Sequence, residues 1–222
     1  MTPDPAYRTR REHLQLDAAT RLHYDRVTNA DELVDALLAK GDDHEDVRDD
    51  RLPYWADPWH SALALARHVW TDPLICPGTR VTELGCGLAL PGIATALRGA
   101  DVLLTDYLPE ALNFARRNAA FNTAAPIRYL QLDWRRPQPA ARADLILAAD
   151  VAYESRYFPV LEQCFRQLLL PGGRVLLTEP GRGIAAEWTD GLTNAGFTVT
   201  RSEHPVTLDG ATRLVRLHEL RI

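Results

Sequence analysis

The stretch that most constrains this chain is RVTELGCGLALPG, residues 80–92, together with the acidic residue that follows it. Val81 to Leu84 is predicted to form a buried strand, and the apolar residues from Leu90 to Leu97 a helix. Gly85-Cys86-Gly87 lies between them and is typical of a tight turn. Asp106 follows about 20 residues after the turn, at the end of the strand-like segment ADVLLTD. This order of strand, glycine turn, helix and acidic strand end indicates a nucleotide-binding unit.

The residues around the turn favour one kind of ligand over another. Two glycines let the backbone approach a ligand closely, and the start of the helix presents unpaired N–H groups. The dinucleotide fingerprint G-x-G-x-x-G has a glycine where this chain has Leu90. Glu83 would repel a pyrophosphate and favour a cation or an amine, both of which S-adenosylmethionine carries. Asp106 would then accept hydrogen bonds from ribose hydroxyls. The alternative is that this strand, turn and helix form an ordinary structural unit that binds no ligand.

Length and charge bound the remaining possibilities. A chain of 222 residues is expected to form one large domain, alone or with an appendage. The formal net charge of −5 argues against a general affinity for nucleic acid backbones. The three cysteines are widely spaced, which predicts neither disulfides nor a metal site and suits a reducing compartment. The N-terminus lacks a signal-like apolar stretch, and no later run approaches the roughly 18 residues that span a bilayer, so we expect a cytoplasmic protein.

The first fifty residues carry weak signals. Disorder is expected from Met1 to about Arg11, and a short hairpin from Leu14 to Val27. Asp31 to Lys40 has leucines at helical spacing, and Gly41 would end that helix. The acidic run GDDHEDVRDDR, residues 41–51, is expected to be a solvated loop, with a docking surface for a basic partner as the alternative.

Strand and helix signals alternate along the rest of the chain. Pro58 suits the first turn of a helix that continues to Val69. An aromatic cluster, Tyr54, Trp55 and Trp59, precedes that helix and either caps the core or contacts a ligand. Further helices are expected at Pro109–Asn122, Tyr157–Leu169 and Ile184–Ala195, further strands at Ile127–Leu132, Ala143–Ala149 and Arg174–Thr178, a turn at Pro171-Gly172-Gly173, and a final hairpin whose strands Phe197–Glu203 and Thr212–Leu220 are joined by HPVTLDGA. The pattern predicts an α/β fold with a Rossmann-like, doubly wound, seven-stranded sheet, mostly parallel with an antiparallel C-terminal hairpin strand.

Two further strand ends carry polar residues. Asp133 and Trp134 follow the third strand, where the carboxylate could accept from an adenine amino group and the indole could cover its face. A solvent-facing loop with a buried tryptophan is the alternative. Ala143–Ala149 is the most apolar strand and is therefore expected at the centre of the sheet. Its end bears Asp150 and Tyr153, which would border the ligand crevice of an open α/β sheet.

From about Tyr54 to Ile222 the chain resembles the class I, seven-strand S-adenosylmethionine-dependent methyltransferases. Within them it is most similar to the protein-lysine methyltransferase group called methyltransferase family 16. The matching motifs are ELGCGLALPGIATALRGA, TDY, LDW and LILAADVAY, the last containing the D-x-x-Y of the group. YWADPW and EPGR resemble the branch that methylates lysines of the electron transfer flavoprotein β subunit. The resemblance implies a methyltransferase domain over residues 51–222, preceded by an N-terminal extension over residues 1–50.

The resemblance also implies roles for individual residues. Asp150 and Tyr153 would border the substrate amine as catalytic residues. The cofactor, S-adenosylmethionine, would contact Trp59, Glu83, Gly85, Cys86, Gly87, Asp106, Tyr107, Asp133, Trp134 and Ala149. Leu88 and Leu90 are bulkier than the residues often found after these glycines.

The implied activity is methylation of a lysine in a protein partner, with nucleic acid and membrane partners not expected. A small-molecule or nucleic acid methyltransferase on the same fold is one alternative, since a fold does not fix the acceptor. The Asn/Asp-Pro-Pro-Tyr motif of amino-methylating nucleic acid enzymes is absent from the sequence. A catalytically silent cofactor-fold protein that binds a partner is the other alternative.

Overall fold

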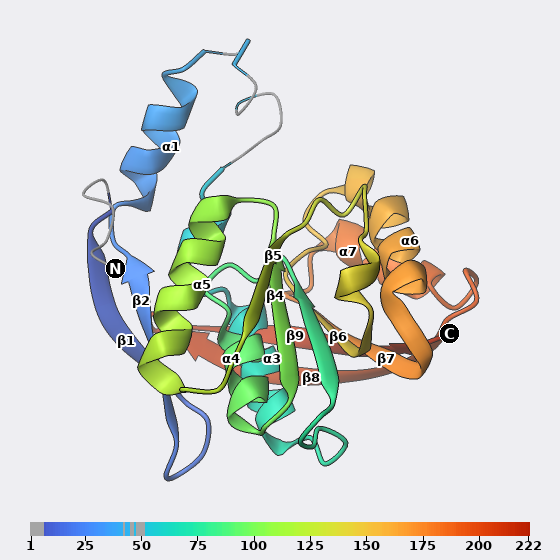
Figure 1. The fold of residues 1–222 in the computed structure, drawn as a ribbon. Coiled ribbons are helices and arrows are strands. Elements are labelled where there is room, and N and C mark those ends of the chain that lie inside the picture. Colours follow the sequence, from blue (N-terminus) through green and yellow to red (C-terminus); the bar gives the residue numbers. More distant parts are fainter. Residues whose placement is uncertain (1–6, 42, 45–46, 48–51) are drawn as a thin grey trace.

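The computed structural model describes residues 7–41, 43–44, 47 and 52–222, and a seven-stranded sheet forms its centre (Figure 1). The strand order is β5-β4-β3-β6-β7-β9-β8. The parallel strands are β3 (Arg80–Leu84), β4 (Asp101–Asp106), β5 (Arg128–Gln131), β6 (Ala143–Ala149) and β7 (Leu169–Glu179), and the antiparallel hairpin is β8 (Thr198–Leu208) and β9 (Ala211–Arg221). The predicted fold class is confirmed.

Helices cover both faces of the sheet (Figure 1). One group is α3 (His60–Thr71), α4 (Leu90–Leu97) and α5 (Pro109–Asn122), the other is α6 (Phe158–Leu168) and α7 (Gly183–Gly191), and the short 3-10 helices are η1 (Tyr54–Ala56), η2 (Pro139–Ala141) and η3 (Ser155–Tyr157). Alternate side chains of β6 serve the two faces, since Leu145 and Leu147 pack into one core while Ile146 and Ala148 pack into the other. Burial on both faces explains the continuous apolar run of β6, and its predicted central place is confirmed.

The strand order creates a crevice at one edge of the sheet. From β3 the chain moves outward to β4 and β5, and it then returns to β6 on the other side of β3. The connections that leave the carboxyl ends of β3 and β6 therefore run in opposite directions. Ligands of open α/β sheets bind at such a switch point, beyond the carboxyl ends of the strands.

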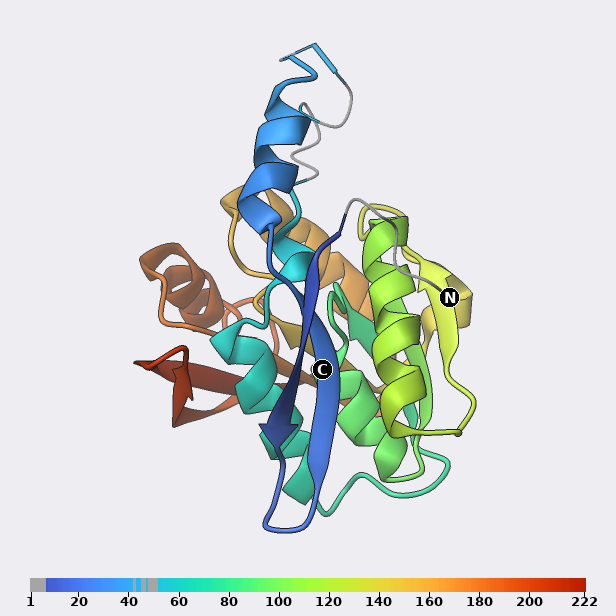
Figure 2. The ribbon, with the colours of Figure 1, turned by 90° about the vertical axis from the view of Figure 1, so that its left-hand side faces the viewer.

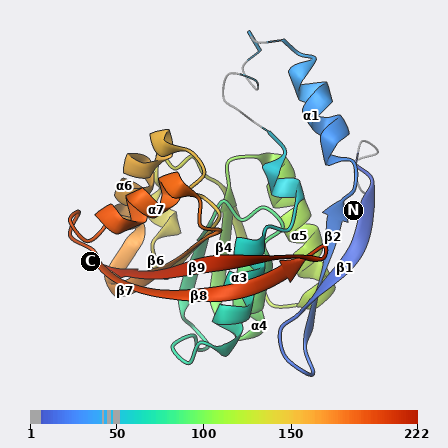
Figure 3. The ribbon, with the colours of Figure 1, turned by 180° about the vertical axis from the view of Figure 1, so that it is seen from behind.

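The C-terminal hairpin is longer than predicted (Figure 3). The expected eight-residue connection HPVTLDGA is wrong, because β8 and β9 stay paired as far as Leu208 and Ala211. Asp209 and Gly210 alone make the turn, with φ of 51° and 76°, as two-residue hairpin turns require. Similarly, the predicted turn at residues 171–173 is part of β7, which shifts its register against β6 between Ala143 and Leu145.

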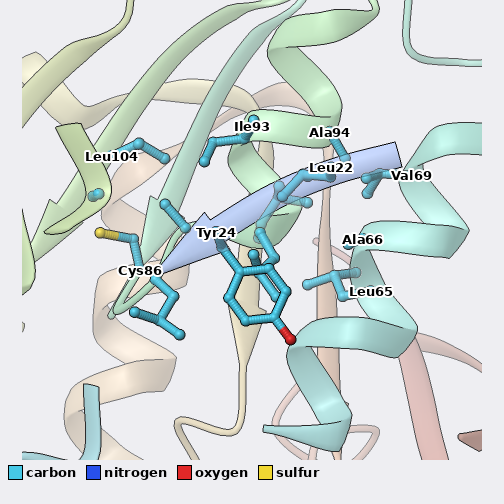
Figure 4. Packing of buried hydrophobic residues seen from close by; sticks show 14 of the residues in the cluster. Leu22, Tyr24, Leu65, Ala66, Val69, Cys86, Ile93, Ala94 and Leu104 are labelled. Carbon is cyan, nitrogen blue, oxygen red and sulfur yellow. The ribbon is translucent and has the colours of Figure 1, made fainter. Parts of the chain in front are cut away.

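An antiparallel hairpin, β1 (Thr9–Gln15) and β2 (Arg21–Val27), packs outside α4 and α5 (Figure 2). The predicted hairpin is confirmed, but the expected disorder is wrong for Thr9 to Arg11, which pair with β2; residues 1–6 lie outside the described residues. Leu22 and Tyr24 of β2 lie beside the side chains of α3 and α4 in one core (Figure 4). Two amide side chains of α5 bond the β2 backbone: Asn122 bonds both the N–H and the C=O of His23 at 2.7 Å, and Asn118 Oδ1 accepts from Asp25 N at 2.9 Å.

The helix α1 (Ala30–Leu38) follows the hairpin and confirms the predicted helix. It projects beyond the rest of the domain (Figures 1 and 2). Most of the acidic run 41–51 and the expected domain boundary at residue 50 lie outside the described residues. No helix in the described part of the chain is long and apolar enough to cross a membrane.

Candidate active site

A pocket opens at the carboxyl ends of the parallel strands, where the switch point predicts a ligand site. Its walls come from the ends of β3, β4, β5 and β6 and from η1 and the start of α3. All of the predicted site residues line it: Trp59, Glu83, Gly85, Cys86, Gly87, Asp106, Tyr107, Asp133, Trp134, Ala149, Asp150 and Tyr153. The structure therefore brings the predicted residues together, and the role of each one stays a prediction.

The glycine turn after β3 is required by the chain itself as much as by a ligand. Gly85 and Gly87 have φ of 62° and 48°, a left-handed conformation that other residues rarely adopt. A Cβ at Gly85 would lie 3.0 Å from Trp134 Cζ2, and one at Gly87 would lie 3.3 Å from the carbonyl oxygen of Trp55. Both glycines therefore allow the two tryptophans to pack against the turn that forms the pocket floor.

Glu83, on β3, is a buried acid that accepts a hydrogen bond from the backbone of α4. It is 1% exposed, and its Oε2 accepts from Gly92 N at 2.9 Å, so it ties β3 to the first turn of α4. Burial raises the pKa of Glu83 to about 8, and the hydrogen bond from Gly92 opposes that rise only in part. A positive group in the pocket would favour the ionised form of this side chain.

Asp106, at the end of β4, is held by backbone donors. Its carboxylate accepts from Gly87 N and Leu108 N, each at 3.0 Å. Burial raises the pKa of Asp106, and these hydrogen bonds oppose the rise. Tyr107 supplies a third backbone hydrogen bond. A carboxylate has about four lone-pair sites, so acceptor capacity for a ribose hydroxyl remains.

The segment after β5 forms the side wall. Asp133 and Trp134 line the pocket as predicted, and so does Arg135, which sequence reasoning missed. Arg135 donates to Asp133 through Nε and Nη2 at 2.8 to 2.9 Å. The sequence did place Arg135 directly after Asp133 and Trp134, the two residues predicted to contact adenine.

Asp150, which follows β6, has an unusual backbone and two side-chain partners. Its φ is 59°, which is uncommon outside glycine and typical of strained functional positions. The hydroxyl of Ser61 on α3 donates to Oδ2 at 3.1 Å, and Arg182, before α7, donates to Oδ1. Neither partner was predicted to contact Asp150, although Arg182 belongs to the EPGR motif. Both carboxylate oxygens are thus already engaged in the protein.

A series of neighbouring aromatic rings also lines the pocket that contains Asp150. Trp59 lies 6.3 Å from Tyr54, Tyr54 lies 5.9 Å from Tyr153, and Tyr153 lies 6.1 Å from Tyr157, measured between ring centroids. Trp59 Nε1 donates to the carbonyl oxygen of Tyr54 at 2.7 Å, which fixes η1 against α3. Burial raises the pKa of Tyr153, so its phenol stays protonated at neutral pH. Tyr157 was not predicted.

The donor set fits a cofactor that is cationic and carries hydroxyl and amino groups. Carboxylates end β4 and follow β5 and β6, a buried acid precedes the glycine turn, and aromatic rings complete the wall. Such groups attract a sulfonium and an amine and accept hydrogen bonds from a ribose. The doubly wound sheet and this pocket define a class I S-adenosylmethionine-dependent methyltransferase.

The profile of the lysine methyltransferase family matches residues 59–186, which is more than half of the chain. The chain belongs to this family. The matched region contains the glycine turn, Asp106, the segment after β5 and the D-x-x-Y of Asp150 and Tyr153.

Relatives of known name fall into several branches of the family. The match to the mouse EEF1A lysine methyltransferase 3 is 35% identical and covers 60% of this chain and 58% of the relative. The zebrafish electron transfer flavoprotein beta subunit lysine methyltransferase is 33% identical over 59% of this chain and 51% of its own length. The human histone-arginine methyltransferase METTL23 is 30% identical over 59% of this chain and 72% of its own length. The matches to the two lysine enzymes thus span little more than half of those relatives.

Solved structures share the fold. The ribosomal protein L11 methylase of Lactobacillus delbrueckii aligns with a TM-score of 0.59 at 22% identity, over 74% of this chain and 80% of that one. Magnesium protoporphyrin IX methyltransferase of Synechocystis, solved with bound SAM, aligns with a TM-score of 0.59 at 16% identity, over 88% and 92% of the two chains. At these identities the likeness supports the fold alone.

Proposed function

We propose that the chain methylates lysine side chains of a protein partner. The observation that carries the proposal is the series of rings Trp59, Tyr54, Tyr153 and Tyr157 beside the carboxylate of Asp150. Aromatic faces attract a cationic head group and pack along an aliphatic stem, which together describe a lysine side chain. The names of the mouse and zebrafish relatives support the same acceptor.

When bound, S-adenosylmethionine would supply an electrophilic methyl carbon. A neutral amine would form a bond to this carbon while the carbon–sulfur bond opposite it breaks and S-adenosylhomocysteine leaves, so the protein has to align the amine and exclude water. A lysine amine has a free pKa near about 10.4 and must lose its proton before attack. Asp150 already accepts from Ser61 and Arg182, so we assign it the orientation of the acceptor side rather than removal of the proton. The protonated phenol of Tyr153 borders the acceptor and would orient the amine.

The test is incubation of the purified chain with methyl-labelled S-adenosylmethionine and a cell extract, followed by separation of protein, nucleic acid and small molecules. We expect label in protein, and mass spectrometry should place it on lysine. Tyr153→Phe should mainly lower turnover, whereas Asp150→Asn should lower both turnover and acceptor affinity; neither should change cofactor affinity appreciably. Label found only in small molecules or RNA would reject the lysine proposal while leaving the methyltransferase family assignment intact.

A matched control removes the same hydroxyl elsewhere. Tyr129 lies on β5, partly buried under the guanidinium of Arg116, and outside the pocket lining. Tyr129→Phe should therefore leave turnover unchanged. Loss of turnover in both tyrosine variants would point to a general structural effect and not to a role of Tyr153 at the acceptor.

An arginine side chain is the second candidate acceptor. The human relative is named a histone-arginine methyltransferase, and the guanidinium is also a cation on an aliphatic stem. The same mass spectra distinguish the two acceptors, because fragment ions place the added methyl group on one residue type.

We also propose that residues 51–222 form the methyltransferase domain, that residues 1–50 extend it, and that the protein acts in the cytoplasm. Cys76 is a free, exposed thiol, which suits a reducing compartment. The negative net charge supports a protein rather than a nucleic acid partner. Fluorescent tagging of the chain in cells would test the location.

A further inference from the structure

Arg135 is a positively charged side chain in the wall of the pocket, and it contacts the carboxylate of Asp133. Its Nε lies 2.9 Å from both carboxylate oxygens of Asp133, and its Nη2 lies 2.8 Å from Oδ2. The backbone N–H of Arg135 also donates to Oδ1 at 2.9 Å. The carboxylate of Asp133 is therefore fixed in direction by the residue two positions further on. A bidentate guanidinium fixes a carboxylate in a way that a lysine ammonium does not.

The ion pair keeps Asp133 able to accept hydrogen bonds. Partial burial raises the pKa of Asp133, but the hydrogen bonds and charge of Arg135 outweigh burial, and the pKa is lowered overall. An ionised carboxylate has about four lone-pair sites, and the backbone N–H, Nε and Nη2 of Arg135 occupy most of them, which leaves about one site for a further donor. An adenine presents an amino donor, whereas a hypoxanthine presents a carbonyl oxygen at the same position.

The guanidinium of Arg135 also lies near the end of the neighbouring strand β4. The Cζ atom of Arg135 lies 5.8 Å from the ring centroid of Tyr107, which directly follows Asp106. Gln131 Nε2 donates to the carbonyl oxygen of Tyr107 at 3.0 Å and ties the same two segments together. Arg135 thus lies between the residue predicted to contact adenine and the loop predicted to contact the ribose.

Arg135 and Trp134 face different surroundings. The indole of Trp134 packs against the glycine turn, 3.0 Å from the Cβ position of Gly85, on the inner side of the pocket. The side chain of Arg135 is 51% exposed and lies toward solvent. A planar guanidinium stacks well on a nucleobase, and at this rim it would shield the base from water.

We propose that Arg135 determines recognition of the cofactor's adenine, by holding the carboxylate of Asp133 toward the adenine amino group and by covering the base on its solvent side. The inference rests on the proposed contact of Asp133 with adenine, and it does not depend on the acceptor.

The test measures binding of two probes to the full chain by calorimetry. One probe is S-adenosylhomocysteine, and the other is S-inosylhomocysteine, in which an oxygen replaces the amino group of the base. A hydrogen bond to a charged acceptor predicts that the unmodified chain prefers the adenosyl probe by about tenfold or more. Arg135→Ala should weaken the adenosyl probe by about fivefold to tenfold and reduce the preference to about threefold or less. Arg135→Lys, which keeps the charge without the planar fork, should recover only part of the preference.

Arg136→Ala is the matched control, because it removes the same charge one residue further on, from a side chain outside the pocket lining. It should change affinity for either probe less than about twofold. An unchanged preference in Arg135→Ala overturns the proposal, even if affinity for both probes falls. Asp133→Ala removes the acceptor altogether, so a retained preference in that variant rejects the adenine contact itself. Loss of the preference in Asp133→Ala with full retention in Arg135→Ala rejects only the role of Arg135.

Discussion

The two halves of the pocket differ in what fixes them. Backbone groups fix the half that we propose for the cofactor, here called the cofactor half, which comprises Glu83, Gly85, Gly87 and Asp106: both carboxylates accept from backbone N–H donors, and both glycines have positive φ. Ring contacts fix the half that we propose for the acceptor, here called the acceptor half, which comprises Tyr54, Tyr153 and Tyr157, with Trp59 packed against Tyr54 at its border. The first half is therefore intolerant of change, whereas the second can alter its shape by exchange of side chains. A family that shares one cofactor and differs in acceptors would gain from this division.

The largest difference between the halves should appear in the pH dependence of stability. The unfolded carboxyl of Glu83 titrates near 4.5 and the folded one near about 8, so between these values the folded state holds one more proton. Stability from this group is present below the lower pKa and is lost as pH rises through the upper one. The free energy of unfolding, measured by urea denaturation, should therefore fall with rising pH in this window, by at most about 1.4 kcal/mol per pH unit relative to Glu83→Gln.

The control for this slope is Glu187→Gln, which alters an exposed carboxyl on α7. Its slope should match that of the unmodified chain. Equal slopes of the free energy of unfolding against pH in all three proteins would mean that Glu83 is ionised in the folded state. The two halves would then not differ in the pH dependence of stability.

Gly92→Ala should have the next largest effect. A Cβ at this position would lie 2.5 Å from Glu83 Oε2 and closer still to Leu104 Cδ2, so α4 would have to move away from β3 and β4. We expect a loss of about 1 to 3 kcal/mol in the free energy of unfolding, measured by urea denaturation. Gly191→Ala, at a helical position with no atom within 4 Å, should instead be neutral or stabilising by up to about 1 kcal/mol. A neutral Gly92→Ala would show that the cofactor half tolerates change.

Asp106→Ala should weaken S-adenosylmethionine binding by about tenfold or more, because a charge-assisted hydrogen bond contributes roughly 1.5 to 3 kcal/mol. Calorimetry on the folded variant measures this. Asp101 lies at the other end of β4, where it pairs with Arg128, and Asp101→Ala should leave affinity unchanged. Unchanged affinity in Asp106→Ala would remove this carboxylate from the cofactor site.

Tyr54→Ala should have the smallest effect on the cofactor. Tyr54 is 46% exposed and contacts Trp59 and Tyr153 rather than the strand ends. We expect a change of less than about twofold in S-adenosylmethionine affinity, or roughly 0.4 kcal/mol, by calorimetry. A tenfold loss would place Tyr54 against the cofactor and erase the boundary between the halves.

The same contrast explains what could be predicted from the sequence. Glu83, Gly85, Gly87 and Asp106 lie within a short stretch whose strand, turn and helix signals are local, so their convergence followed from the topology of the sheet. Asp150 was expected at the crevice for the same reason, but its partners were not. Ser61 and Arg182 reach it from positions 89 and 32 residues away, and no local pattern encodes such a contact.

Predicted strand boundaries were wrong where two local sequence signals conflicted. His204 and Pro205 read as the start of a loop, yet β8 continues through them because it is an edge strand, where a proline removes no ladder hydrogen bond. Arg135 and Tyr157 were missed because the sequence does not show which way a side chain points, even where, as for Arg135, it lies close to a predicted site residue. The fold class was accessible from periodicity, whereas side-chain partnerships required the structure.

The amide contacts between α5 and β2 have a consequence for synthesis of the chain. Asn122 lies 99 residues after the His23 backbone that it bonds. Among the described strands, β2 pairs with β1 on one edge and with none on the other. At roughly 5 to 20 residues per second, a ribosome needs about 5 to 20 seconds to add the intervening segment. α3 and α4, which cover Leu22 and Tyr24, are added during that interval, but α5 is completed only at its end. Until then the open edge of the hairpin can pair with other nascent chains. We therefore expect the N-terminal hairpin to need chaperone protection while the chain is being made.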